Sequence, residues 1–242
     1  MKLLARFNLI FIVVFGLGLT VAGWLAYGFL QKDAKDSVRE QARLMMESTL
    51  ASREYTASQI EPLLTAHSRH VTVFLPQTVP NYAATQIFDY IHKRNPDYTY
   101  KEATLNPTNP VDRAIDWEAD VVNIFRNDRS RKYFYGGRPA PGGKSLYFAR
   151  PIQIADPACL DCHSTPNKAP VSMVRQYGRD NGFGWKPNEI VGAQIVSVPE
   201  SLPIQIADRA FKTLLAYLCA LGLMTLLILD ALLIVTVIRP GR

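Results

Sequence analysis

Two long apolar stretches, one near each end of the chain, limit what this 242-residue sequence can fold into. The first runs from about Phe7 to Leu30 and the second from about Leu214 to Ile238. Because about 20 apolar residues in a helix cross the hydrocarbon core of a bilayer, both stretches predict transmembrane helices. The first is longer than the apolar core of a cleaved signal peptide, about 7 to 15 residues, so we expect an uncleaved anchor.

These stretches divide the chain into an N-terminal anchor over 1–30, a folded domain over 31–212 and a second transmembrane helix over 213–242. Lys and Arg number 27 against 21 Asp and Glu, too small an excess for a nucleic-acid interface. No nucleic-acid partner is therefore expected.

Asp230 lies inside the second stretch, where a carboxylate is costly unless it faces a partner helix or sits near the membrane boundary. It indicates a homo-oligomer.

Between the spans, the spacing of apolar residues changes from helical to alternating. Pro62 is expected to kink or end the first helix, and Gly and Pro residues predict a turn over 138–143. Helices first and antiparallel strands after them predict an α+β domain. The last strand should lead directly into the second span. Helices are expected over 31–66, 63–74, 82–93, 112–125 and 171–177, and strands over 98–104, 131–136, 144–154 and 189–198.

Cys159, Cys162 and His163 form the most specific motif of the sequence, Cys-x-x-Cys-His. Two thiols at this spacing can bond the two vinyl groups of one porphyrin, and the next residue supplies an imidazole to the iron, as in c-type haem attachment. A structural zinc site needs four ligands, and the only other cysteine, Cys219, lies in the second apolar stretch. A redox dithiol does not need the histidine. We therefore expect one covalently bound haem c, with His163 as iron ligand.

Several further motifs, taken together with this one, resemble a family of periplasmic c-haem sensor domains. The family is PAS-like and was long described as a domain of unknown function. The resemblance extends over most of residues 33–200. The stretches that carry it are Tyr98-x-Tyr100-Lys101-Glu102-Ala103-Thr104-Leu105-Asn106-Pro107-Thr108-Asn109-Pro110, Trp117-Glu118, Tyr147-x-Ala149-Arg150-Pro151, the cysteine motif, and Tyr177-Gly178-x-x-Asn181-Gly182-Phe183-Gly184-Trp185.

The resemblance implies a PAS-like antiparallel sheet with flanking helices, carried between the two spans. It also implies haem bound through Cys159 and Cys162, with His163 as the proximal ligand. Some relatives supply a cysteine as the sixth ligand, but no cysteine precedes Cys159 here. The sixth position is therefore left open, either vacant or filled by one of five side chains. These are Met45, Met46, His67, His70 and Met173.

Other residues near the motif in sequence are candidates for contact with the porphyrin. Arg150 is expected to bind a propionate, because a guanidinium matches a carboxylate in geometry, with Lys144, Arg138 and Arg175 as further cations. Tyr147, Phe183 and Trp185 are expected to line the ring, with Phe148 as a further candidate, although aromatic residues in strands also serve as ordinary core. The glycines at 182 and 184 predict a close backbone approach, to the haem or within a plain turn.

Two functions fit these features. Haem attachment takes place outside the bacterial inner membrane, so we expect a periplasmic domain and cytoplasmic termini. The first hypothesis is a sensor that passes a redox change or the binding of a small gas ligand through the second span. The second is an anchored electron-transfer cytochrome with a redox partner. Val237-Ile238-Arg239-Pro240 is similar to the opening of a HAMP segment, but the sequence stops at Arg242, where an output module would begin. We therefore expect that the signal passes to a partner protein or that the chain is a truncated form. No distal acid/base pair can be identified in the sequence, so we do not expect an enzyme.

Overall fold

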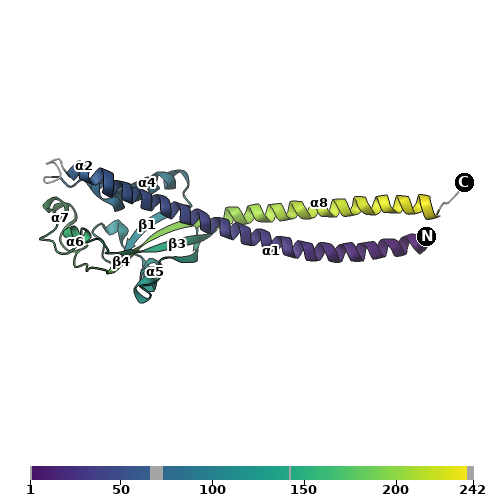
Figure 1. Cartoon of the computed structure of the whole chain (residues 1–242), viewed down its shortest axis with the longest axis horizontal. Helices are drawn as coiled ribbons and strands as arrows, with labels where there is room; N and C mark the ends of the chain where they lie inside the picture. Colours follow the sequence, from purple (N-terminus) through teal and green to yellow (C-terminus); the bar gives the residue numbers. More distant parts are fainter. Residues whose placement is uncertain (1, 66–72, 142, 239–242) are drawn as a thin grey trace. The chain divides into compact units, whose positions relative to one another are not determined.

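The computed structural model describes residues 2–65, 73–141 and 143–238 (Figure 1). It divides into two compact units. One consists of Met1–Ser37 and Ser201–Arg242, and the other of Val38–Glu200. The predictions that concern His67 and His70, and most of the helical piece over 63–74, lie outside the described residues.

The first unit is made of two long apolar helices. Helix α1 spans Lys2–Tyr55, and α8 spans Ser201–Leu233, followed by a π-helical turn, η4, over Ile234–Ile238. Both helices are long and apolar enough to cross a membrane. Their apolar side chains are largely uncovered, with Trp24 75% exposed. The two predicted spans are therefore present as candidate membrane helices.

Polar contacts join the two helices of this unit. The Asn8 side-chain amide donates to the Asp230 carboxylate at 3.1 Å, and Gln31 donates to Asp208 at 2.6 Å. Asp230 thus faces a neighbouring helix, which is the condition under which a carboxylate is tolerated in an apolar segment.

The second unit contains a four-stranded antiparallel sheet in the order β1-β4-β3-β2. The predicted α+β class is confirmed. Strand β4 lies inside the sheet and is buried along almost its whole length. Only Glu200 separates it from α8. The strands are β1 Thr99–Thr104, β2 Phe134–Ala140, β3 Gly143–Gln153 and β4 Ile190–Pro199.

Helices cover both faces of the sheet (Figure 1). The part of α1 from Val38 onward and α4 (Pro80–Arg94) pack on one face, where Met46 and Phe88 meet Phe148 and Val196. Helix α5 (Asp116–Asn127) packs on the other face, against Ala149, Ala193 and Ile195. Because successive strand residues point to opposite faces, alternate residues of β3 and β4 supply two separate cores.

Two element boundaries differ from the prediction near the start of the domain. Helix α1 ends at Tyr55 and continues through a π-helical turn, η1 (Thr56–Ile60), into the short α2 (Glu61–Thr65). The break precedes Pro62, whose nitrogen cannot donate to the preceding turn, so the irregularity falls upstream of the proline. Helix α5 begins at Asp116, four residues later than expected, after a 3-10 turn, η3, over Pro110–Asp112.

The predicted turn over 138–143 is wrong in extent. Strand β2 continues through Arg138 and Pro139 to Ala140, and Pro139 pairs with Lys144 of β3. Proline lacks the donor that an inner strand needs, but β2 is at the edge of the sheet, where one side of the strand has no partner strand. The edge position therefore allows a strand where the composition indicated a turn.

Candidate functional site

The Cys-x-x-Cys-His motif lies in a long connection between β3 and β4. The base of this connection is closed by backbone hydrogen bonds from Ile154 to Glu189 O, 2.9 Å, and from Asn188 to Ile154 O, 2.8 Å. The connection contains two short helices, α6 (Cys159–His163) and α7 (Val171–Tyr177). The sheet thus holds both ends of the segment that carries the motif.

Helix α6 presents the two thiols together. Cys159 and Cys162 are three residues apart, a spacing that puts side chains on the same face of a helix. Both are partly buried free cysteines. Burial raises the pKa of each thiol, and the neighbouring carboxylates of Asp156, beside Cys159, and Asp161, beside Cys162, raise it further. Both sulfurs are therefore neutral thiols at neutral pH.

His163 is held in one tautomer. Its Nδ1 lies 2.7 Å from the carbonyl oxygen of Gly182 and 3.4 Å from the Thr108 hydroxyl. A carbonyl can only accept, so Nδ1 carries the proton and donates it, which leaves the Nε2 lone pair available to a metal. Burial lowers the pKa of His163, which favours the neutral imidazole that metal binding requires.

Trp185 packs on the same imidazole. The two rings are stacked, with centroids 4.0 Å apart and planes 16° from parallel. The Trp185 amide also donates to His163 O at 3.3 Å, and the Gly184 amide donates to Ser164 O at 3.0 Å. Trp185, which was expected to line the porphyrin, therefore lies directly against His163, and its contact with a porphyrin stays a prediction. Its position fixes the plane of the imidazole.

The Asn106 to Pro110 loop completes the support of His163. The Asn106 side chain accepts from the Gly182 amide at 3.3 Å and donates to Phe183 O at 3.4 Å. Gly182 has a φ of 80°, and a Cβ there would lie 2.0 Å from the Thr108 hydroxyl. The close backbone approach predicted for this glycine is therefore an approach to the chain at Thr108.

A buried ion pair lies near the motif. Arg53 of α1 pairs with Glu102 of β1, whose side chain is 2% exposed. Tyr100 donates to the same Glu102 oxygen at 2.7 Å, and Gln194 donates to the Tyr100 hydroxyl at 3.4 Å. The Arg53 charge opposes the rise in the pKa of Cys159, so the guanidinium lies within electrostatic reach of that thiol. A buried charge pair close to the motif thus joins helix α1 to the sheet.

The other residues predicted at the site lie in several places. Tyr147 packs against Trp117 and Phe134, with ring centroids 5.1 and 6.1 Å apart, on the face covered by α5. Arg150 of β3 pairs with Glu47 of α1 at 3.6 Å. Phe183 joins the Asn106 loop through its carbonyl. The roles proposed for these three side chains toward a porphyrin stay predictions.

The candidates for a sixth ligand are also dispersed. Met46 is fully buried in the core between α1, α4 and the sheet, and Met45 packs against the same core. Met173 of α7 is 4% exposed. Among these methionines, Met46 therefore has a clear structural role as core.

The residues of the motif fit a c-type haem. Two neutral thiols one helical turn apart and a neutral imidazole with Nε2 available are the groups that such an attachment uses. Within the described ranges, no cluster of three or more His, Cys, Asp or Glu side chains has the arrangement of a metal site. The zinc interpretation therefore gains no support from that part of the chain.

A class of protein follows from this fold and this site. A family model described as Tll0287-like matches residues 31–199. Because the match covers well over half of the chain, the chain belongs to the Tll0287-like family. This agrees with the resemblance drawn from the motifs as far as the family is concerned. The sensory role implied by that resemblance stays a prediction.

A solved structure gives the same picture of the fold. The cyanobacterial heme-protein Tll0287 aligns with 66% of this chain and 93% of its own, with a TM-score of 0.51 and 18% identity. At this identity the similarity establishes a common fold. No curated protein sequence matches the chain.

The carboxyl of Asp112, in η3, is expected to make stability depend on pH. Burial and the charge of Glu102 raise its pKa from 3.8 to about 6. A raised carboxyl pKa stabilises the fold below pH 4, and this contribution is lost as pH rises through 6. Between pH 4 and 7 we expect the free energy of unfolding of Asp112→Asn to rise by about 1 to 2 kcal/mol relative to the wild type. This value is discounted because Asp112 is partly exposed.

Thermal and urea unfolding followed by circular dichroism at pH 4, 5.5 and 7 would measure this difference. Asp128→Asn is a suitable control that should run parallel to the wild type over this range. Hydrogen bonds from Ser130 and Arg131 lower the pKa of Asp128 below its ordinary value, so its contribution to stability is lost only below pH 4. A wild type and an Asp112→Asn variant whose stabilities run parallel across this range would contradict the prediction.

Proposed function

We propose that this chain binds one haem c covalently through Cys159 and Cys162, with His163 as an iron ligand. The observation that carries the proposal is the hydrogen bond from His163 Nδ1 to Gly182 O beside two free thiols on one helical turn. Membership of the Tll0287-like family supports it, as does the likeness in fold to a heme-protein. When bound, the haem iron supplies a redox couple and a position for a further ligand.

The residues around the motif have separate tasks in this proposal. Cys159 and Cys162 would hold the porphyrin to α6, each thiol adding its S–H across one vinyl double bond, with the sulfur bonding one carbon and the hydrogen going to the other. Gly182 and Trp185 fix the tautomer and the plane of His163, as supporting groups do for metal-ligating histidines. Asn106 holds the Gly182 loop in turn. The ligand geometry would therefore depend on two loops that are distant in sequence.

We infer further that the protein is anchored in a bacterial inner membrane with its central domain in the periplasm and both termini in the cytoplasm. The two candidate membrane helices support the anchoring. Haem attachment outside the membrane supports the orientation. Protease treatment of intact spheroplasts would test it. We expect digestion of the central domain from outside, and full protection would contradict the orientation.

We propose that the function is sensing of redox state or of a small haem ligand, with the signal passed through α8 to a partner protein. The connection between β4 and α8 supports this, because a single residue, Glu200, joins them. The Glu200 amide is itself bonded to Lys144 O at 2.9 Å. Because only one residue lies between the strand and the helix, a change in the conformation of the sheet would be passed on to α8.

Absorption spectra of the oxidised and reduced protein, with and without CO and NO, would test the role of the iron. A five-coordinate iron, or a ligand readily displaced by CO, supports gas sensing. A six-coordinate iron that ignores both gases contradicts it and leaves redox sensing or electron transfer. Hydrogen exchange then separates these two. A redox sensor should change exchange in β4 and early α8 on reduction, and an electron carrier should not.

The Arg53–Glu102 pair gives a separate stability prediction. In Arg53→Met, the buried Glu102 carboxylate has lost its cation. We therefore expect the free energy of unfolding to fall by about 2 to 3 kcal/mol, a value discounted because Arg53 is partly exposed. The double variant Arg53→Met/Glu102→Leu should lose less than the single one, because no buried charge is left unpaired.

Thermal unfolding of the full chain in detergent would measure these changes. Arg43→Met is a suitable control, because Arg43 pairs with Glu40 at 2.6 Å on an exposed face, where solvent screening leaves an ion pair little net effect on stability. Equal losses in Arg53→Met and Arg43→Met would show that the Arg53 pair is not energetically distinct.

A further inference from the structure

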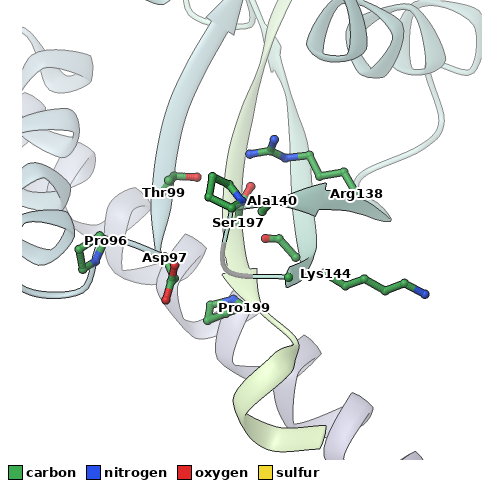
Figure 2. A pocket seen from close by; sticks show the side chains of 11 residues that line it. Pro96, Asp97, Thr99, Arg138, Ala140, Lys144, Ser197 and Pro199 are labelled. Atoms are coloured by element: carbon green, nitrogen blue, oxygen red, sulfur yellow. The ribbon is translucent and has the colours of Figure 1, made fainter.

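A pocket of about 230 Å³ lies at one end of the sheet and is lined by no residue of the cysteine motif (Figure 2). It opens where β1, β2, β3 and β4 come together near the turn between β2 and β3. Its walls combine apolar and polar side chains. The residues that line it are Pro96, Asp97, Thr99, Arg138, Ala140, Pro141, Gly143, Lys144, Ser145, Ser197 and Pro199.

The strand register places the polar side chains of this pocket on one face. Ser197 is two residues from Ile195, which packs against α5, so it points to the α5 face. Thr99 pairs with Ser197, and Arg138 pairs with Ser145. The Thr99 hydroxyl of β1, the Ser197 hydroxyl of β4 and the Arg138 guanidinium of β2 therefore lie at the end of the face that α5 covers.

Arg138 is the central cation of the pocket. Its guanidinium lies over the Trp117 ring, 4.6 Å from the centroid, and Figure 2 shows the side chain reaching across the sheet toward Ser197. Its Nε is buried and has no hydrogen-bond partner within the described part of the chain. A buried donor on a charged group is costly when unpaired, so an acceptor that reaches the terminal nitrogens of the same guanidinium would offset part of this cost.

The remaining groups define what that acceptor is. The two terminal nitrogens of a guanidinium lie side by side, which matches the two oxygens of a carboxylate. The Ser145 hydroxyl already donates to Val198 O at 3.0 Å, which leaves Thr99 and Ser197 as the hydroxyls beside the cation. The pocket also contains Asp97, whose charge disfavours an anion of high charge. Four apolar wall residues suit a short carbon chain.

We propose that this pocket binds a small organic monocarboxylate through Arg138. The acid group pairs with the Arg138 fork, and the carbon chain lies against the apolar residues that line the walls, Pro96, Ala140, Pro141 and Pro199. The proposal does not rest on the haem. Because Ser197 and Pro199 end the strand that precedes α8, the site would add an input of its own at that strand.

Calorimetric titration of the full chain in detergent, with sodium propionate as the probe, tests the proposal. We expect millimolar or tighter binding, with propionamide, a neutral molecule of the same shape, at least about tenfold weaker. Arg138→Gln should weaken propionate binding by about tenfold or more. Arg131→Gln is the matched control and should change it by less than about threefold, since Arg131 pairs with Asp128 at 3.2 Å and does not line the pocket.

Several results would overturn the proposal. These are no binding of propionate, equal binding of propionate and propionamide, or unchanged binding in Arg138→Gln. Tighter binding of inorganic phosphate would overturn the assignment to a carboxylate. Unchanged haem absorption and circular dichroism would show that Arg138→Gln is folded. If it is not, Ser197→Ala takes its place and should weaken binding about threefold or more, with unchanged binding counting against the site.

Discussion

Replacing Cys159 and Cys162 together by alanine is expected to remove all covalently bound haem. Each thiol supplies one of the two bonds to the porphyrin, and α6 offers no other sulfur. Cys162→Ala or Cys159→Ala alone should leave at most a single bond. Haem staining of the denatured protein on a gel, and extraction with acidified acetone, would measure what stays attached to the polypeptide.

Cys219→Ala is the matched control for this experiment. Cys219 is exposed on α8, in the other unit of the structure, and its loss should leave the haem content unchanged. Covalent haem that survives in the double variant would refute the proposed attachment. Haem that is lost equally in Cys219→Ala would show that the assay reports expression rather than attachment.

Gly182→Ala should have the largest effect on the geometry of the site. Its φ of 80° costs an alanine about 1 to 2 kcal/mol. The new Cβ would also lie 2.0 Å from the Thr108 hydroxyl and 2.7 Å from the Thr108 Cα. Relief of this overlap must move the loop whose carbonyl holds His163. We expect a total loss of about 3 kcal/mol or more and a changed iron spectrum.

Gly184→Ala separates the two contributions. Gly184 has almost the same φ, 82°, but a Cβ there meets no atom within 4 Å. This variant should therefore show only the backbone strain, about 1 to 2 kcal/mol, with little change in the iron spectrum. Thermal unfolding and absorption spectra of both variants would provide the comparison. Equal losses would mean that contact with Thr108 does not constrain the site.

Much of the fold could be predicted from the sequence because most elements have local signals. Helix α4 begins with Pro80 and ends before Asn95-Pro96, and β4 ends at Pro199, so proline marks the boundaries as expected. The boundaries that differed depend on tertiary context. The extension of β2 through Pro139 requires an edge position, and the sequence alone does not say which strand lies at the edge.

The attachment residues could also be predicted, because the spacing of two cysteines and a histidine is specific to haem attachment. The residues that support His163 could not be predicted. Asn106 and Gly182 are 76 positions apart, and nothing local indicates that an amide of one loop bonds the backbone of the other. Arg53 and Glu102 likewise meet across 49 positions. The Asn-Pro and Gly-Phe-Gly motifs that resemble the family lie in these two loops, but the motifs do not predict that the loops contact each other.

The hydrogen bonds that close the base of the β3 to β4 connection have a consequence for engineering. Ile154 exchanges backbone bonds with Glu189 and Asn188, so the chain leaves the sheet and returns to it at one place. The segment between them is in effect a cassette. A short turn in its place should preserve the sheet, and the segment carries both thiols and the imidazole as one unit that could be transplanted between two antiparallel strands of another protein, together with the Asn106 to Pro110 loop that supports His163.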